Sequence, residues 1–333
     1  MIEQIYIEDS VREHPTTLRV CNQFPKASIV SIGRYGEVFN RSNQNFRLQK
    51  KKSALILAEK QNETVLPTPS NYTIGGSKNY YFSHMLNCLY DCRYCFLQGM
   101  FRSANYVFFV NDEDFKKGLQ SVLDQESANS EEPVYFFSGY DCDSLALEKI
   151  TQFTIHYFPF FRENKNAMLE LRTKSSNIRP LLSVPPLPNA IIAFTMSPEP
   201  IAKEVEHKSA STLRRIQSAK KLAHAGWRIG LRLDPLIYHE NWKENYSLLL
   251  DQLSKEIPEE SIHSVTMGPM RFPKAMFHRI QELYPKDPLI SGPLHSDGKN
   301  VSYEKSIEME MHAYCKELLS NYYSENRLFC YEV

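Results

Sequence analysis

Short apolar runs recur along this chain and alternate with longer segments in which apolar residues return every three or four positions. The short runs are rich in β-branched and aromatic residues, which is typical of strands buried on both faces. They are YYFSHML (80–86), VYFFSGY (134–140), MLELRTK (168–174), AIIAFTMS (190–197), RIGLRLDPLI (228–237) and SVTMGPM (264–270). The pattern therefore predicts six strands.

The longer segments between these runs have the period of amphipathic helices. Ser211 has the position of a helix N-cap, and Gly226 follows the last apolar turn of the same segment. Strands that alternate with helices form parallel sheets with right-handed crossovers. We therefore expect an α/β fold, a partial (β/α)6 TIM-like barrel, with a doubly wound sheet as the second choice. The expected helices cover 112–125, 144–158, 211–226, 241–257 and 272–285, with a final helix at 307–326.

The pattern also divides the chain into three parts. Residues 1–75, with the basic tract LQKKK (48–52), are expected to be an N-terminal extension packed on the barrel. The barrel would cover 76–286, and 287–333 would form a C-terminal segment and helix. No run of about 18 apolar residues is present, and the N-terminus lacks the pattern of a signal peptide. We expect a cytoplasmic protein with no membrane partner.

Charge and cysteine content limit the kinds of binding site that the chain could form. Lys+Arg and Asp+Glu are equal at 39 each among 333 residues, so any nucleic-acid site must be local. The 7 cysteines are odd in number and unevenly spaced, unlike the disulfide framework of a secreted protein. Reduced thiols that are free to bind metal are the better interpretation.

Three of these cysteines form a cluster directly after the first expected strand. Cys88, Cys92 and Cys95 have the spacing C-x3-C-x2-C in NCLYDCRYCFLQ (87–98). Loops after the strands of an α/β barrel build its active site. Three thiolates without a fourth nearby suit a [4Fe–4S] cluster that keeps one iron open. The alternative is a structural zinc site in which His84 is the fourth ligand.

The motif resembles that of radical S-adenosylmethionine (SAM) enzymes, and a longer collinear set of motifs resembles the spore photoproduct lyase family. The set comprises YIED near the N-terminus, NCLYDCRYCFLQ, LRTKS (171–175), HKSASTLRRIQSAKKLAHAGWRIG (207–230), LDPLIYHENWKENY (233–246) and MRFPKAMFHRIQELYP (270–285).

The resemblance implies one [4Fe–4S] cluster, SAM, and a flavodoxin or ferredoxin-type electron donor. It also implies a 5′-deoxyadenosyl radical that abstracts hydrogen from a thymine-dimer lesion in DNA. Two alternatives stay open. One is radical SAM chemistry on a non-DNA nucleotide, a peptide or a small molecule, and the other is a zinc-stabilised barrel that binds nucleic acid without catalysis.

The resemblance also implies roles for residues around SAM. Tyr94 matches an aromatic residue against the adenine, Lys174 the basic residue that holds the SAM carboxylate, and Ser197 a polar contact to SAM. Cys142 occupies the position where the lyases have a hydroxyl that contacts SAM.

Two positions depart from the family. Tyr140 stands where the lyases have their hydrogen-donating cysteine, and Phe96 replaces the second of two tyrosines that relay the hydrogen atom, of which Tyr94 is the first. Phe96 has no hydroxyl to relay a hydrogen atom. Cys142 is a candidate substitute donor if the strand continues that far, because residues two apart on a strand face the same side.

Candidate substrate residues follow the last two expected strands. Arg232, Asp234 and Tyr238 are expected at the barrel mouth, although Arg232 and Asp234 could instead pair with each other. Arg271 and Lys274 are candidates for contacts with phosphate. The segment 286–306 has turn residues and no arginine, so we expect the basic DNA wedge of the lyases to be absent.

Overall fold

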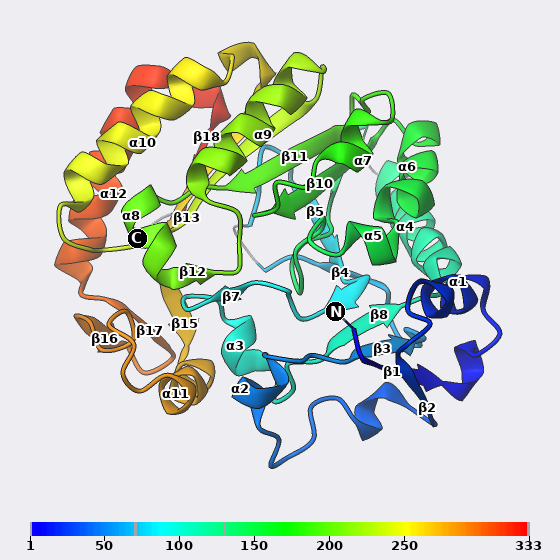
Figure 1. Cartoon of the computed structure of the whole chain (residues 1–333). Helices are drawn as coiled ribbons and strands as arrows, with labels where there is room; N and C mark the ends of the chain where they lie inside the picture. Colours follow the sequence, from blue (N-terminus) through cyan, green and yellow to red (C-terminus); the bar gives the residue numbers. More distant parts are fainter. Residues whose placement is uncertain (1, 70–71, 129–130, 332–333) are drawn as a thin grey trace.

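A curled sheet of eight strands forms the larger part of the fold in the computed structural model, which describes residues 2–69, 72–128 and 131–331 (Figure 1). Its strand order is β18-β14-β13-β11-β10-β9-β5-β4, and all pairs are parallel except β4 with β5. The strands are β4 (Val65–Pro67), β5 (Lys78–Phe82), β9 (Val134–Phe137), β10 (Ala167–Thr173), β11 (Ala190–Thr195), β13 (Arg228–Leu236), β14 (Ile262–Pro269) and β18 (Leu328–Cys330). The expected partial barrel is confirmed.

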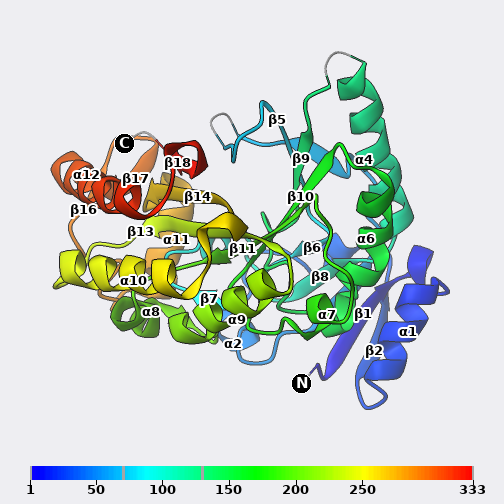
Figure 2. The same cartoon turned by 90° about the horizontal axis from the view of Figure 1, so that it is seen from above.

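Helices cover the outer face of this half-barrel (Figure 2). In α9 (Thr212–His224) the residues Ile216, Ala219 and Leu222 are buried at helical spacing, and the Ser211 hydroxyl caps the helix by accepting the Arg214 N–H at 3.3 Å. The other helices around the sheet are α4 (Asp112–Ser127), α5 (Glu148–Thr151), α6 (Phe153–Glu163), α7 (Arg179–Leu182), α8 (Glu199–Val205), α10 (Trp242–Glu256) and α12 (Lys305–Tyr322).

A second sheet lies beside the half-barrel and is built mostly from the N-terminal 75 residues. Its order is β2-β1-β3-β8-β6, from β1 (Gln4–Glu8), β2 (Ser28–Ile32), β3 (Leu55–Ala58), β6 (Met85–Leu86) and β8 (Tyr106–Phe109), with α1 (Pro15–Gln23) and α2 (Phe46–Gln49). The first expected strand, 80–86, is therefore divided: β5 ends at Phe82, and β6 joins the other sheet. The division of the chain at residue 75 stays a prediction.

A three-stranded sheet follows the half-barrel near the C-terminus. It has the order β15-β17-β16, from β15 (Arg271–Pro273), β16 (Leu294–Ser296) and β17 (Asn300–Tyr303), next to α11 (Lys274–Leu283). Strands β16 and β17 of this region form an antiparallel hairpin, turned at Gly298 with a φ of 95°. The expectation that the basic DNA wedge of the lyases is absent stays a prediction. The hairpin does lack arginine.

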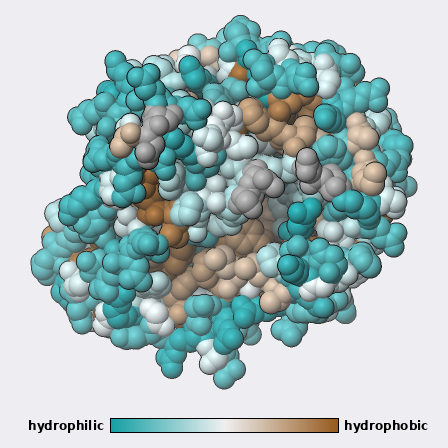
Figure 3. Space-filling model, turned by 180° about the vertical axis from the view of Figure 1, so that it is seen from behind, coloured by the Kyte–Doolittle hydropathy of each residue, from teal (hydrophilic) through white to brown (hydrophobic). Residues whose placement is uncertain are grey.

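Short elements complete the fold. They are β7 (Asp91–Cys92), β12 (Glu206–His207) and α3 (Leu97–Met100), with single 3-10 turns at η1 (Asp9–Val11), η2 (Tyr35–Glu37), η3 (Glu259–Ser261) and η4 (Glu325–Arg327). From behind, the molecule is hollowed at its centre, where apolar side chains gather inside a polar rim (Figure 3). None of the helices within the described residues has both the length and the apolar character that crossing a bilayer requires.

Candidate active site

The loop that carries the three cysteines is held from below by Lys50 at the end of α2. The Lys50 ammonium, 8% exposed, donates to the carbonyl oxygens of Cys88 and Tyr90 at 2.8 and 2.9 Å. Asn87 has a φ of 69°, and its side-chain amide donates to the carbonyls of Ser103 and Asn105 at 2.7 Å each. These contacts fix the turn that precedes the first cysteine.

The second half of the loop is fixed by strand pairing. In the β7–β12 ladder Cys92 is opposite Glu206, and the Cys95 N–H donates to the Cys92 carbonyl at 3.1 Å. Burial raises the pKa of all three thiols, that of Cys88 to about 12. A thiolate at this depth therefore requires a cation beside it, which bound iron or a buried lysine supplies.

Three cysteine thiols on one loop are the donor set that a [4Fe–4S] cluster with one open iron uses. Among the residues that the structure describes, no three His, Cys, Asp or Glu side chains converge closely enough to hold one ion. A [4Fe–4S] cluster binds each cysteine through a different iron, so it takes thiolates that stand further apart. The donor set of three cysteines on one loop fits that group.

The position of the His84 side chain does not support its role as the fourth ligand of a zinc site. Its ring is 1% exposed and packs against Phe153 and Tyr157 of α6, with ring centroids 4.8 and 6.2 Å away. Neither ring nitrogen has a hydrogen-bond partner among the described residues, and burial lowers its pKa to about 3. The expected alternative of a Cys3His zinc site has no support in these contacts.

Lys174 lies on the barrel side of the cysteine loop, close to Tyr94 of that loop. The Lys174 ammonium is 5.2 Å from the centroid of the Tyr94 ring. Burial by itself lowers the pKa of Lys174, but the nearby Cys92 and Glu206 outweigh it, and the net shift is upward. Lys174 therefore keeps its charge in a partly buried site, where it is available to an anionic ligand.

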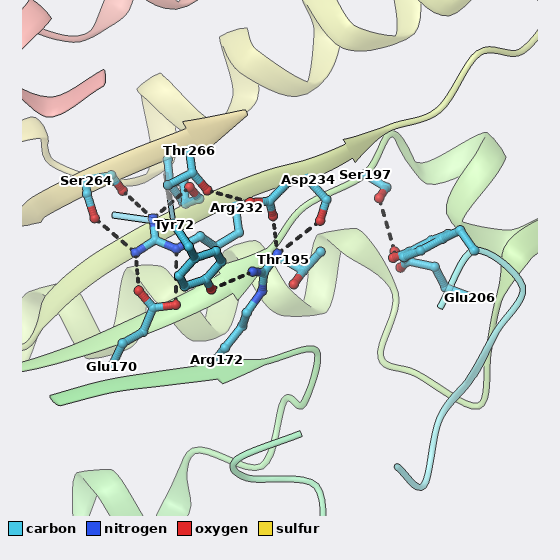
Figure 4. A network of polar contacts seen from close by, with 12 residues as sticks. Tyr72, Glu170, Arg172, Thr195, Ser197, Glu206, Arg232, Asp234, Ser264 and Thr266 are labelled. Carbon is cyan, nitrogen blue, oxygen red and sulfur yellow. Dashed lines mark hydrogen bonds and ion pairs between the residues drawn. The ribbon is translucent and has the colours of Figure 1, made fainter. Parts of the chain in front are cut away.

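The carboxylate of Glu206, which the sequence pattern did not reveal, contacts several side chains on the barrel side of the cysteine loop. Glu206 is 4% exposed and accepts hydrogen bonds from the hydroxyls of Tyr94 and Ser197, the latter at 3.1 Å (Figure 4). It also forms an ion pair with Arg215 of α9, in which both side chains are fully buried. Burial works to raise the Glu206 pKa, but Arg215 and Lys174 hold it below its usual value.

Asp143 is a second carboxylate that sequence reasoning missed. It accepts the backbone N–H of Lys174 at 2.6 Å and the hydroxyl of Thr173 at 2.7 Å. It also accepts the N–H groups of Leu145 and Ala146 at 3.0 and 2.8 Å. Asp143 thus ties the loop after β9 to the end of β10, which positions Lys174. The DCDS tetrapeptide was the only signal for it.

The interior of the half-barrel holds two ion pairs whose partners differ from those expected (Figure 4). Arg232, 1% exposed, pairs with Glu170 at 2.7 Å, and Asp234 pairs with Arg172. The expected pairing of Arg232 with Asp234 is wrong, because alternate residues of β10 and β13 meet across the sheet interior.

The remaining candidate substrate residues lie on the surface next to the hairpin. Tyr238 is 37% exposed, and its N–H donates to the Tyr303 hydroxyl of β17 at 3.1 Å. Arg271 in β15 and Lys274 at the start of α11 are exposed. The structure therefore brings Tyr238 to the hairpin and leaves the two cations on the outer edge of the small sheet.

Known proteins resemble this chain along nearly its whole length. The family model "Spore photoproduct lyase" matches residues 2–326. The chain belongs to the spore photoproduct lyase family. Spore photoproduct lyase of Bacillus subtilis (strain 168) is 24% identical over 296 residues, which cover 86% of this chain and 83% of the relative. The enzyme of Geobacillus sp. (strain Y412MC61) is 24% identical over 205 residues, 61% of this chain and 59% of that protein.

Solved structures of spore photoproduct lyases share the fold. A variant with bound AdoMet and dinucleoside spore photoproduct superimposes with a TM-score of 0.83 at 17% identity, over 98% of both chains. A complex with dinucleoside spore photoproduct gives a TM-score of 0.82 at 18% identity, again over 98% of both chains. The family match confirms the resemblance that the motifs carried and the expectation of a lyase-type radical SAM enzyme.

The two positions at which we expect this chain to depart from the lyases lie in contact with each other. The Tyr140 ring is 5.7 Å from Phe96 and 4.5 Å from Tyr81, measured between centroids. Strand β9 ends at Phe137, so the condition for placing Cys142 on the same face as Tyr140 is not met. Cys142 is instead 8% exposed, in an apolar cluster with Met85, and its thiol donates to the Ser138 carbonyl at 3.7 Å.

Proposed function

We propose that this protein is a radical SAM enzyme of the spore photoproduct lyase type that acts on a thymine-dimer lesion in DNA. The observation that carries the proposal is the joint position of the three-cysteine loop, Lys174 and Ser197 at the carboxyl end of the parallel strands. Family membership and the lesion and AdoMet bound to related enzymes support it.

The residues at and around the cysteine loop, here called the SAM half of the site, each have a defined task. Cys88, Cys92 and Cys95 would hold a [4Fe–4S] cluster, which supplies the electron that cleaves SAM to a 5′-deoxyadenosyl radical. Lys174 would bind the SAM carboxylate through its partly buried ammonium, a charge-assisted contact. Ser197 offers a hydroxyl to SAM, and Tyr94 offers a ring face. We assign the supply of the electron to a flavodoxin or ferredoxin-type protein.

The substrate half of the site favours a second candidate function. Tyr140 and Phe96 replace the donor cysteine and the second relay tyrosine, and the hairpin carries no arginine. Such a site holds neither the thiol nor the wedge with which the lyases handle duplex DNA. The second candidate is therefore radical SAM chemistry on a non-DNA nucleotide, a peptide or a small molecule, with Tyr140 or Cys142 as the hydrogen donor.

One experiment tests the shared core of both candidates. The protein is reconstituted anaerobically with iron and sulfide, and 5′-deoxyadenosine formed from SAM is measured after reduction. Cys92→Ala should abolish iron retention and SAM cleavage, whereas Cys21→Ala in α1, remote from the loop, should preserve both. Retention of about one zinc per chain with no uptake of iron would contradict the proposal. Addition of a dinucleoside spore photoproduct then separates the two candidates, because only a repair enzyme converts it to thymines.

A further inference from the structure

Four exposed basic side chains surround α2 on the outer side of the cysteine loop. Arg47, Lys51, Arg102 and Lys208, here called the basic patch, are all exposed. Their segments are in contact: Gln49 of α2 accepts the Ala104 N–H at 2.9 Å, and the Lys208 ammonium donates to the Lys50 carbonyl at 2.8 Å. Figure 1 shows α2, α3 and β7 close together below the half-barrel.

The centre of the basic patch is apolar. Leu48 of α2 is 60% exposed. Arg47 and Leu48 belong to α2, which ends at Gln49, and Lys51 follows directly after the C-cap residue of that helix. The side chains of all three residues are exposed. An exposed leucine beside exposed cations is typical of a protein interface, which has an apolar core and a polar rim. A phosphate backbone gains no favourable contact from a leucine side chain.

Only one residue separates this surface from the cysteine loop. Lys208 binds the backbone carbonyl of Lys50, and the Lys50 side chain donates to the carbonyls of Cys88 and Tyr90. The route from the surface to the loop is therefore two hydrogen bonds and one buried side chain. The opposite side of the loop faces Lys174 and Ser197.

Acidic side chains near the loop do not cancel the patch. Asp91 and Asp287 both pair with Arg93, at 2.9 and 3.1 Å. Arg93 in turn lies over the Tyr284 ring at 4.0 Å, and Arg47 lies over the same ring at 5.8 Å. In a chain with equal numbers of cationic and anionic side chains, the exposed surplus here is positive.

We propose that the basic patch docks an acidic one-electron carrier protein and delivers its electron to the cysteine loop through Lys50. The proposal rests on the proposed function, which requires one electron for each SAM cleavage. The carrier is oxidised by one electron and the loop-bound cluster is reduced by one, with no bond made or broken. Complementary charge accelerates such encounters and makes their rate depend on salt.

DNA is the other macromolecule that a cationic surface could attract. The exposed Leu48 and the contact of Lys50 with the cysteine loop favour the carrier. The experiment below distinguishes the two.

The test uses charge reversal and two electron sources. Arg47→Glu with Lys51→Glu is compared with Arg162→Glu with Lys165→Glu, a matched reversal of two exposed cations at the end of α6. Cluster-loaded proteins are mixed with reduced flavodoxin or with dithionite, and bleaching of the cluster is followed at low and high salt. Flavodoxin affinity is measured separately on cluster-free protein, so that docking is tested even if the proposed function fails.

We expect the α2 reversal to slow reduction by flavodoxin at least about tenfold at low salt, and to flatten its salt dependence. Reduction by dithionite and the α6 control should stay within about twofold of the unchanged protein. Equal flavodoxin rates and affinities in the two double variants would overturn the proposal, as would a loss of duplex DNA affinity with flavodoxin affinity unchanged. If the double variant fails to fold, Lys51→Glu alone, at a fully exposed position, should still weaken flavodoxin affinity.

Discussion

Removing Arg215 should be among the most destabilising single changes in the protein. Its guanidinium pairs with Glu206, and both side chains are fully buried. Loss of one partner of a buried pair leaves an uncompensated charge and costs about 3–5 kcal/mol. We therefore expect Arg215→Met to lower the free energy of unfolding of the anaerobic, cluster-loaded protein by about that amount, measured by urea unfolding.

The double variant separates the pair from the packing around it. Glu206→Gln removes the other charge, so Glu206→Gln with Arg215→Met should be less destabilised than the sum of the single variants, with a coupling free energy of about 2 kcal/mol. The Glu206 pKa is held below its usual value, so this stabilisation is present above the unfolded carboxyl pKa, about 4.3, and is lost as the pH falls below it. A cost of Arg215→Met under about 1 kcal/mol, or strictly additive effects, would refute the reasoning.

The same carboxylate should matter for SAM. Glu206 accepts from the hydroxyls of Tyr94 and Ser197, so Glu206→Gln weakens two charge-assisted contacts that orient them. We expect SAM affinity to fall about tenfold at unchanged iron content, since each such contact is worth about 1.5–3 kcal/mol before rearrangement. Arg232→Met, which breaks the equally buried pair with Glu170, is the matched control: it should destabilise the fold and leave SAM affinity unchanged.

Three further predictions concern His84, Lys174, and the pair Tyr140 and Phe96. The His84 pKa is about 3 in the folded protein and about 6.5 unfolded, so the unfolded state takes up the proton first and stability should fall by about 2 kcal/mol between pH 7 and 5. His84→Phe should remove this decrease, and an unchanged pH profile would contradict the burial argument. Lys174→Ala should weaken SAM binding by about 1.5–3 kcal/mol without loss of iron, as measured by equilibrium dialysis against a Lys165→Ala control; equal affinities would reject the role of Lys174. Tyr140→Cys with Phe96→Tyr should raise thymine formed from a dinucleoside spore photoproduct relative to 5′-deoxyadenosine. Tightly coupled repair by the unchanged protein, surviving Cys142→Ala, would show that neither departure matters.

Much of the fold could be predicted because most of the strands have a recognisable local pattern of apolar residues. The runs that became β10, β11, β13 and β14 are rich in apolar residues and mostly buried, since helices cover one face and the barrel interior the other. The prediction of a single strand over the first run, 80–86, was wrong for a physical reason. Ser83 and His84 lie between β5 and β6, and a run of seven residues cannot reveal that its two halves join different sheets.

The cysteines of the site could be predicted, but the partners that position them could not. A C-x3-C-x2-C motif is visible because its ligands are close in sequence. Glu206 and Lys50 are 114 and 38 residues from Cys92 and Cys88, respectively, and only the β7–β12 ladder and the end of α2 bring them together. The same holds for Arg232, whose true partner Glu170 is 62 residues away.

The two halves of the site differ in how firmly the fold specifies them. In the proposed SAM half, buried side chains hold the site residues: Asp143 accepts from the backbone of Lys174, Glu206 accepts from Tyr94, and Lys50 donates to the cysteine loop. Buried networks that are fully satisfied rigidify the groups they hold. On the proposed substrate side, the contacts of the Tyr140 side chain among the described residues are with the Tyr81 and Phe96 rings, and Tyr238 is 37% exposed. We therefore expect changes at Tyr140 or Tyr238 to leave the proposed SAM half intact, so that the substrate and hydrogen donor could change at little cost to radical generation.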